Sequence, residues 1–220
     1  MITNKKNIRF IPIGLSIVLI LCLFFAFNSQ SASAAEKVRI NLEKIDESIQ
    51  NEINNRTILS LSSNPYDYVV DNQYYDKIIL LGVAALPELE TTLINSENNG
   101  LNEYILAIAI EEISKVDVNK ILGNTDYGWE NAMEFESEWT KIKSTASHAV
   151  ETIILSNELD TEEKIMQISN YGILAIPSLE SYLSAVDSRE KSSLDTELEK
   201  LVGSYRLSKN DISIIDDFVN

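Results

Sequence analysis

The sequence predicts an all-α protein in which amphipathic helices stack on one another behind an N-terminal targeting segment. Apolar residues recur at spacings of three and four through most of the chain, which is the period of a helix with one buried face. No long stretch alternates with the period of two that a half-buried strand shows. Two twelve-residue stretches, GVAALPELETTL at 82–93 and GILAIPSLESYL at 172–183, are closely similar and lie 90 residues apart. Self-similarity at a fixed spacing indicates repeated structural units.

Residues 1–34 have the organisation of a signal peptide. Basic residues within the first nine positions precede an apolar run over 10–27, and the small-residue pattern Ala-Ser-Ala follows at 32–34. We expect cleavage at Ala34 or Ala35. If the segment is retained, the run over 10–27 is near the lower limit for a membrane anchor and is the only expected membrane contact. Because basic residues stay inside, either outcome places the remaining chain outside the cytoplasm, secreted or anchored.

Residues 35–63 are expected to form an N-terminal amphipathic helix that ends in a polar turn. Its apolar positions step by four, three, four and four, and they are Val38, Leu42, Ile45, Ile49 and Ile53. The pair Asn64–Pro65 starts a new element, since asparagine is a good N-cap and proline suits the first helical position. We expect residues 64–220 to form one domain of repeated helices.

The first copy of the repeated stretch predicts a corner between two helices. Gly82 ends a short helix, because glycine readily takes the left-handed conformation that follows a helix. Pro87 lies in the first turn of the next helix, where its missing N–H costs nothing. After a polar turn, residues 101–116 form a further helix that is apolar on all sides from Tyr104 to Ile110. Such a helix is covered on both sides and is typical of an interior layer.

The longest helix is expected from Trp129 to about Ser156, after a loop over 117–128. Glutamates crowd its N-terminal half, where the helix dipole favours negative charge. Its apolar stripe steps by four, three, four, three and four. The stripe comprises Phe135, Trp139, Ile142, Ala146, Ala149 and Ile153.

The second copy repeats the arrangement of the first. A capping box at 160–163 opens a short helix, Gly172 ends it, and Pro177 starts the next one. Two more amphipathic helices are expected over 191–202 and 211–218. The spacing of 90 suggests two repeat lengths of about 45, with the longest helix in a degenerate middle unit.

The two copies share six identical residues in twelve. The matching pairs are Gly82 and Gly172, Ala85 and Ala175, Pro87 and Pro177, Leu89 and Leu179, Glu90 and Glu180, and Leu93 and Leu183. These residues resemble the Gly-x-x-Ala-x-Pro-x-Leu signature of bacterial HEAT-like repeats, the helix-pair units of α-solenoids. The resemblance covers roughly residues 64–205, and the same region is similar to small exported proteins of low-GC Gram-positive bacteria with no assigned function. It implies a short HEAT-like α-solenoid and no particular chemistry.

The charge and cysteine content exclude several classes of partner and site. The chain has 18 basic and 34 acidic residues, a net charge of −16. Without residues 1–34, which hold three of the basic residues, the net charge is −19. Such a surface repels nucleic acid and anionic lipid headgroups, so neither is an expected partner. The only cysteine, Cys22, lies in the targeting segment, so the rest of the chain has no disulfide and no cysteine-ligated zinc.

No motif for catalysis, for a metal or for a cofactor stands out. His148 is the only histidine and lies within the predicted long helix without a partner motif, so a structural role is favoured. One histidine and no available cysteine argue against a zinc site. In the loop over 117–128, Ile121 takes the EF-hand position that needs an oxygen ligand. We expect no cofactor and no catalytic residue.

Aromatic residues gather in two places and form the candidate partner surface. Four of the nine tyrosines lie within ten residues, and a second, smaller group follows later in the chain. The six residues are Tyr66, Tyr68, Tyr74, Tyr75, Tyr127 and Trp129. Tyrosine and tryptophan are enriched at binding interfaces. The structural alternative is that they are half-buried residues covering one end of the stack.

Two functions from different classes remain open. The first is an exported α-solenoid that binds a protein or a cell-envelope component as a scaffold, without catalytic activity, because stacked helices offer extended binding surfaces. The second is a carboxylate-dependent hydrolase of the cell envelope, which is favoured only by export and by abundant glutamate. It requires two carboxyl groups that face each other across a deep cleft. A third option is an accessory subunit with no ligand of its own.

Overall fold

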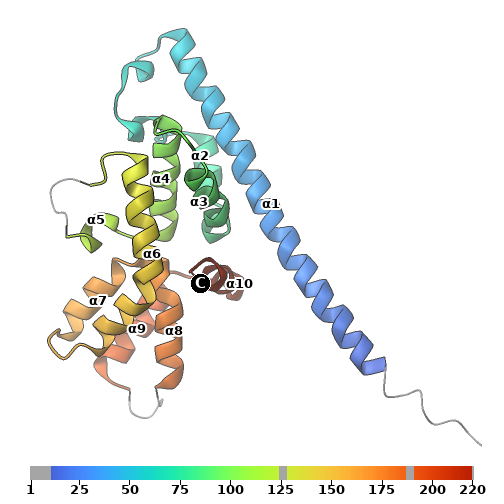
Figure 1. Ribbon diagram of the computed structural model, residues 1–220, viewed down its shortest axis with the longest axis vertical. Coiled ribbons are helices and arrows are strands. Elements are labelled where there is room, and N and C mark those ends of the chain that lie inside the picture. Colours follow the sequence, from blue (N-terminus) through green and yellow to red (C-terminus); the bar gives the residue numbers. More distant parts are fainter. Residues whose placement is uncertain (1–10, 124–127, 187–190, 220) are drawn as a thin grey trace, which may run out of the picture.

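The computed structural model describes residues 11–123, 128–186 and 191–219, and these ranges contain helices and no strand (Figure 1). The all-α prediction is confirmed. The α-helices are α1 (Ile11–Asn55), α2 (Gln73–Ile79), α3 (Leu86–Ile94), α4 (Leu101–Ser114), α5 (Val118–Ile121), α6 (Ala132–Leu155), α7 (Thr161–Ser169), α8 (Ile176–Ala185), α9 (Ser193–Ser204) and α10 (Lys209–Val219). Short 3₁₀ turns are η1 (Leu59–Leu61), η2 (Pro65–Tyr68), η3 (Gly82–Ala85) and η4 (Gly172–Ala175).

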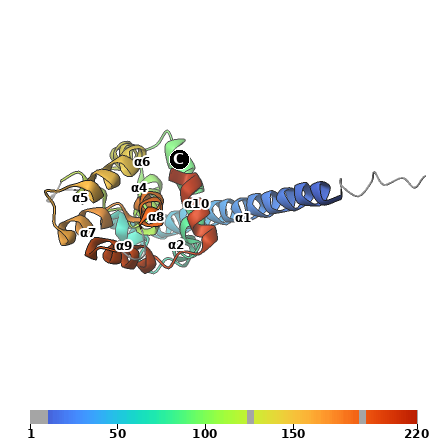
Figure 2. The same ribbon diagram turned by 90° about the horizontal axis from the view of Figure 1, so that it is seen from below.

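Helix α1 is longer than the helix predicted within 35–63. It runs without a break through Ala34 and Ala35, and its N-terminal part projects away from the other helices (Figures 1 and 2). No glycine or proline lies between residues 28 and 55 to interrupt it. Near its C-terminal end, α1 packs against α2, η3 and α3. Arg39 fastens it to α3, with its Nε 3.0 Å from Oε1 of Glu88.

The length of α1 does not by itself make it a membrane-spanning helix. Within the part of the chain that the structure describes, no helix combines the length and the apolarity that a membrane span needs.

Both copies of the repeated stretch form the same corner. Gly82 has φ +58° and Gly172 has φ +51°, so each takes the predicted left-handed conformation where a preceding helix ends. Each glycine begins a 3₁₀ turn, and Pro87 or Pro177 then lies in the first turn of the next helix. The left-handed backbone of the two glycines and the first-turn position of the two prolines are therefore as predicted.

The repeated unit is larger than a helix pair. In the first half, α4 packs against α2 and α3, and in the second half α9 packs against α7 and α8. Helix α1 covers α2, η3 and α3, and α6 covers α7, η4 and α8 in the same way. Between α4 and α6, the described residues form only the four-residue helix α5. The 90-residue spacing therefore corresponds to one unit of a long and three shorter helices, rather than to two units of about 45 residues.

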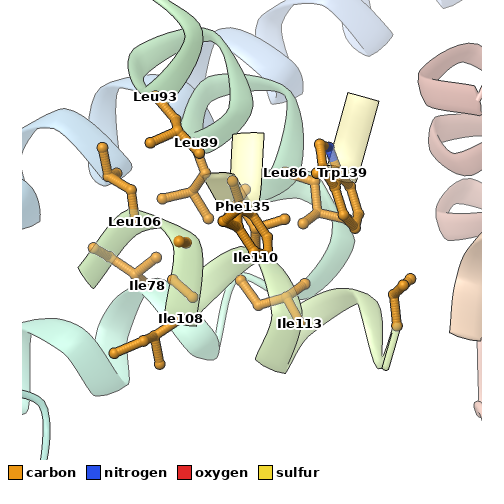
Figure 3. Packing of buried hydrophobic residues seen from close by; sticks show 14 of the residues in the cluster. Ile78, Leu86, Leu89, Leu93, Leu106, Ile108, Ile110, Ile113, Phe135 and Trp139 are labelled. Carbon is orange, nitrogen blue, oxygen red and sulfur yellow. The ribbon is translucent and has the colours of Figure 1, made fainter. Parts of the chain in front are cut away.

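The first unit contains the larger hydrophobic core. Leu86, Leu89 and Leu93 of α3 face the apolar side chains of α4, and Phe135 and Trp139 of α6 lie beside them (Figure 3). Every residue of α4 from 105 to 110 is buried, as its apolar sequence predicts. Burying a leucine contributes about 1.5–3 kcal/mol, so this cluster of leucine, isoleucine and aromatic side chains dominates the stability of the unit.

Helix α6 connects this core to a smaller second one. Its first buried residues, from Ala132 to Ala146, belong to the core of the first unit, whereas Val150 and Ile154 belong to the core of the second. The predicted stripe is therefore wrong at its end, because Ala149 and Ile153 are only half-buried. After Ala146, the buried side chains of α6 lie on the side of the helix that packs against α7 and α8 rather than α4. The buried positions there are four residues apart, at 146, 150 and 154.

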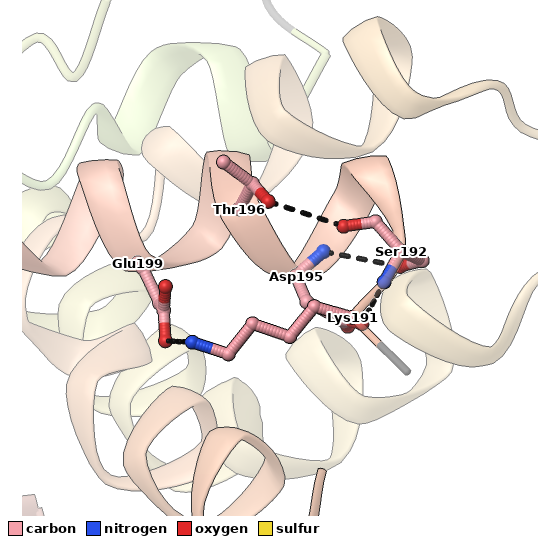
Figure 4. Close-up of polar contacts among 5 residues, drawn as sticks. All are labelled: Lys191, Ser192, Asp195, Thr196 and Glu199. Carbon is pink, nitrogen blue, oxygen red and sulfur yellow. Dashed lines mark hydrogen bonds and ion pairs between the residues drawn. The ribbon is translucent and has the colours of Figure 1, made fainter. Parts of the chain in front are cut away.

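Polar caps set the helix boundaries. Helix α6 begins at Ala132 rather than at Trp129, because Asn131 accepts a 3.1 Å hydrogen bond from the backbone N–H of Glu134. The capping box at 160–163 is confirmed at the start of α7. A third cap opens α9, where the Ser192 N–H donates to Asp195 at 2.7 Å and the Asp195 N–H donates back to the Ser192 hydroxyl at 3.2 Å (Figure 4).

Candidate functional site

A groove of about 640 Å³ lies where the two units meet. We call it the corner groove. It is formed by the first corner, the C-terminal ends of α4 and α9, the start of α10 and one residue of the second corner. Its lining residues are Ile79, Leu80, Leu81, Gly82, Val83, Glu112, Ile113, Lys115, Ile173, Ser204, Tyr205, Arg206, Leu207 and Asp211.

Equivalent positions of the two units contribute to this groove. Val83 and Ile173 occupy the same place in the two corners, and both are buried. Lys115 follows α4 and Arg206 follows α9, and both have left-handed backbones with φ +58° and +53°. Helix α10 packs against η3 and η4 and lies beside the junction of the units (Figure 1). Each unit thus supplies at least one corner residue and one basic residue beyond a helix C-terminus.

The groove is open at the first corner because the two glycines have different surroundings. A Cβ on Gly172 would lie 2.2 Å from the carbonyl oxygen of Ser114, so the end of α4 presses directly on the second corner. A backbone hydrogen bond of 2.8 Å from Asp117 N–H to the Asn170 carbonyl fastens this contact. A Cβ on Gly82 would meet no described heavy atom within 4 Å. The backbone at the end of α4 therefore covers the Gly172 corner, whereas the Gly82 corner faces the groove.

The two carboxylates of the groove have partners inside the protein. Glu112 accepts a 2.8 Å hydrogen bond from the hydroxyl of Tyr75. Asp211 accepts a 2.8 Å hydrogen bond from the Ser208 N–H and so caps α10. Burial, with the hydrogen bond to Glu112, raises the pKa of Tyr75 well above its ordinary value, so this hydroxyl stays protonated and remains a donor.

The two basic residues of the groove, Lys115 and Arg206, have no charged partner among the described residues. The ion pairs among described residues include neither Lys115 nor Arg206. Both side chains are exposed. Lys115 and Arg206 can therefore pair with a ligand, although the groove also carries the negative charges of Glu112 and Asp211.

Three of the predicted aromatic surface residues are buried. Tyr68, Tyr75 and Trp129 are 7%, 4% and 7% exposed. The Tyr68 hydroxyl donates to the backbone carbonyl of Leu59 at 2.9 Å. Trp129 packs against two rings, with centroids 4.4 Å from Tyr104 and 4.9 Å from Phe135. These three side chains offer little surface to a partner and instead hold the end of the first unit together.

Two of the predicted aromatic residues keep accessible rings. Tyr66 is 47% exposed. Tyr74 is half-buried and carries the Lys77 ammonium 4.9 Å from its ring centroid. Tyr127 lies outside the described residues. The structure therefore leaves Tyr66 and Tyr74 as the accessible part of the predicted partner surface.

The described residues contain no group with the composition of a metal centre. His148 is exposed on α6 and does not line the corner groove. Among the described residues, no cluster of three or more histidine, cysteine, aspartate or glutamate side chains could hold a metal ion. The site that sequence reasoning missed is the pair Lys115 and Arg206. Their signal is a basic residue followed by an apolar one after the last helix of each unit, in SKV and YRL.

Comparisons of this chain with protein-family models, with curated proteins and with solved structures found no match. The corner groove is therefore interpreted from its own residues.

Proposed function

We propose that the chain is an exported, non-catalytic binding module with the arrangement of a short HEAT-like α-solenoid, and that it holds a protein or a cell-envelope component. The corner groove is the observation that carries this proposal. It combines apolar walls with two unpaired cations, the mixture that a specific binding site needs. The duplicated helical unit supports it, because stacked helices form extended surfaces for partners.

The chemistry of the groove favours binding over hydrolysis. A carboxylate-dependent hydrolase needs one carboxyl group as an acid and a second as a base or nucleophile. The two carboxylates that line the groove, Glu112 and Asp211, are engaged with Tyr75 and with the start of α10. No observation on the described residues favours the hydrolase.

A second contact surface is proposed at the end of the first unit. Tyr66 and Tyr74 lie in the segment that also exposes Ile58, Leu61 and Val70, which are 91%, 83% and 65% exposed. Exposed apolar and aromatic side chains that gather in one region mark interaction surfaces. The corner groove and this tyrosine segment would then contact different parts of one partner.

The test is to identify the neighbours of the chain in the cell by cross-linking and to compare variants. The double variant Tyr66→Ala/Tyr74→Ala removes accessible rings, whereas Tyr75→Ala would open the core and is unsuitable. We expect one cross-linked partner to be lost or weakened in the double variant. A wild-type chain that captures no partner above background contradicts the proposed function. N-terminal sequencing of the same material tests processing at Ala34 or Ala35.

A further inference from the structure

We propose that the corner groove binds a linear peptide segment in which carboxylate side chains flank an apolar one. This inference rests on the proposed binding function and names the partner chemistry of the same site. Lys115 and Arg206 come from equivalent positions of the two units, so the groove offers two separate cations rather than one. A ligand that satisfies both needs two anionic groups on one backbone.

The walls between these cations are apolar. Val83, Ile113 and Ile173 form buried parts of the lining, and Leu80 stands at the groove 84% exposed. An apolar side chain that enters here removes apolar surface from water on both partners, which favours binding. The volume of about 640 Å³ suits a few residues of a peptide.

The backbone at the groove favours a peptide over a phosphate-rich polymer or an anionic membrane. The last carbonyl groups of a helix lack intrahelical partners, and α4 and α9 both end here. Peptide N–H groups can donate to such carbonyls, whereas phosphate oxygens cannot. The negative ends of two helix dipoles and the net charge of −16 also oppose a densely anionic ligand.

The carboxylates inside the groove do not compete for the two cations. Glu112 accepts from the Tyr75 hydroxyl and Asp211 from the Ser208 N–H. Both keep their negative charge, but neither forms an ion pair with Lys115 or Arg206. Both cations are therefore available to a ligand, and ligand carboxylates placed beside them would meet an opposite charge.

Isothermal titration calorimetry of the purified full chain with a blocked peptide, acetyl-Ser-Glu-Leu-Glu-Ser-amide, tests the proposal. The variant Lys115→Asn/Arg206→Asn removes both cations with a residue that tolerates the left-handed backbone. The variant Lys141→Gln/Lys200→Gln removes two exposed lysines elsewhere, which are 69% and 66% exposed. We expect binding to weaken about tenfold or more in the first variant, equivalent to about 1.4 kcal/mol. The second variant should stay within about twofold of the wild type, since these lysines do not line the groove and exposed ion pairs such as theirs contribute little.

Two further peptides separate the parts of the proposal. Replacing both glutamates by glutamine, or the leucine by serine, should each weaken binding to the wild-type chain. Equal binding of all three peptides, or an equal loss of binding in the groove variant and in the Lys141→Gln/Lys200→Gln control, overturns the proposal. So does binding of phosphatidylglycerol vesicles that depends on Lys115 and Arg206 while the peptide does not bind. If the groove variant still captures the cellular partner, the proposed function stands and the peptide inference falls.

Discussion

The indole Nε1 of Trp139 in α6 donates a 2.8 Å hydrogen bond to the carboxylate of Glu90 in α3. The same carboxylate lies 2.6 Å from Nζ of Lys143. Lys143 in turn places its Nζ 3.8 Å from the ring centroid of Phe218 in α10. One carboxylate therefore ties together α3, α6 and, through Lys143, the C-terminal helix that borders the corner groove.

Removing Glu90 should destabilise the fold far more than removing its repeat counterpart. Glu90→Ala leaves Lys143, 20% exposed, and the buried Trp139 N–H without their acceptor. We expect a loss of about 2–4 kcal/mol in the free energy of unfolding, since breaking a buried pair leaves an uncompensated charge. Among the described residues Glu180 forms no ion pair and no side-chain hydrogen bond, so Glu180→Ala should change stability by less than about 0.5 kcal/mol. Urea unfolding of both variants measures the difference, and equal losses contradict the assigned role of Glu90.

The two corner glycines should respond differently to alanine. In Gly82→Ala the new Cβ meets no neighbouring atom, so the only cost is that of a left-handed backbone at alanine, about 1–2 kcal/mol of stability. Gly172→Ala also forces a Cβ to within 2.2 Å of a backbone carbonyl, so its loss should exceed that of Gly82→Ala by several kcal/mol. Gly203 in α9 has neither constraint, and Gly203→Ala should be neutral or stabilising by up to about 1 kcal/mol. Thermal or urea unfolding of the three variants gives this order, and a harmless Gly172→Ala would refute the close contact with α4.

Alkaline pH should weaken the fold through its buried tyrosines. Burial raises the pKa of Tyr75, and also those of Tyr171 and Tyr205. A raised pKa in the folded state means that the unfolded chain ionises first, so the stability is fully present below about pH 10 and is lost as pH rises above it. We expect the free energy of unfolding to fall between pH 9.5 and about 11.5, and the slope to be smaller in Tyr75→Phe. Absorbance at 295 nm should show phenolate forming together with unfolding; ionisation of all nine tyrosines in a folded chain would contradict this.

Acidic pH should remove the stability that Asp195 contributes at the N-terminal cap of α9. Burial alone would raise the pKa of Asp195, but hydrogen bonds from Ser192 and Tyr182 outweigh it and hold the pKa below its ordinary value. A lowered pKa means that this stability is present above about pH 4 and is lost as pH falls through the folded value. Asp195→Asn should cost about 1–2 kcal/mol at pH 7 and should lose less stability on acidification than the wild type.

The matched control for that variant is Asp217→Asn. Asp217 is exposed near the C-terminal end of α10, where the helix dipole disfavours negative charge. Its removal should be neutral or slightly stabilising at pH 7. If both aspartate variants lose the same stability, the capping role of Asp195 is contradicted.

Local elements were predictable because their signals are local. The left-handed backbone of Gly82 and Gly172, the positions of Pro87 and Pro177 and the caps at 64–65 and 160–163 depend on residues within one turn of each other. The apolar run of α4 identified an interior helix for the same reason.

The candidate groove was not predictable, because its residues come from both units. Nothing near Lys115 or Arg206 in the sequence indicates that α4 and α9 end at the same cavity. The tyrosine cluster shows that residues adjacent in the sequence can also be separated by the fold. Adjacent residues such as Tyr74 and Tyr75 diverge in exposure, because one faces out and the other faces α4.

The sequence alone determined the all-α class, the duplicated corner and the approximate location of most helices, since helix periodicity and capping act over a few residues. Only the tertiary structure decided that the duplicated unit contains four helices, that the end of α4 seals the Gly172 corner and that the Gly82 corner stays open. Two corners with the same local chemistry differ because one meets a neighbouring backbone and the other does not. That difference arises from how the units pack, and it creates the groove on which the proposed function rests.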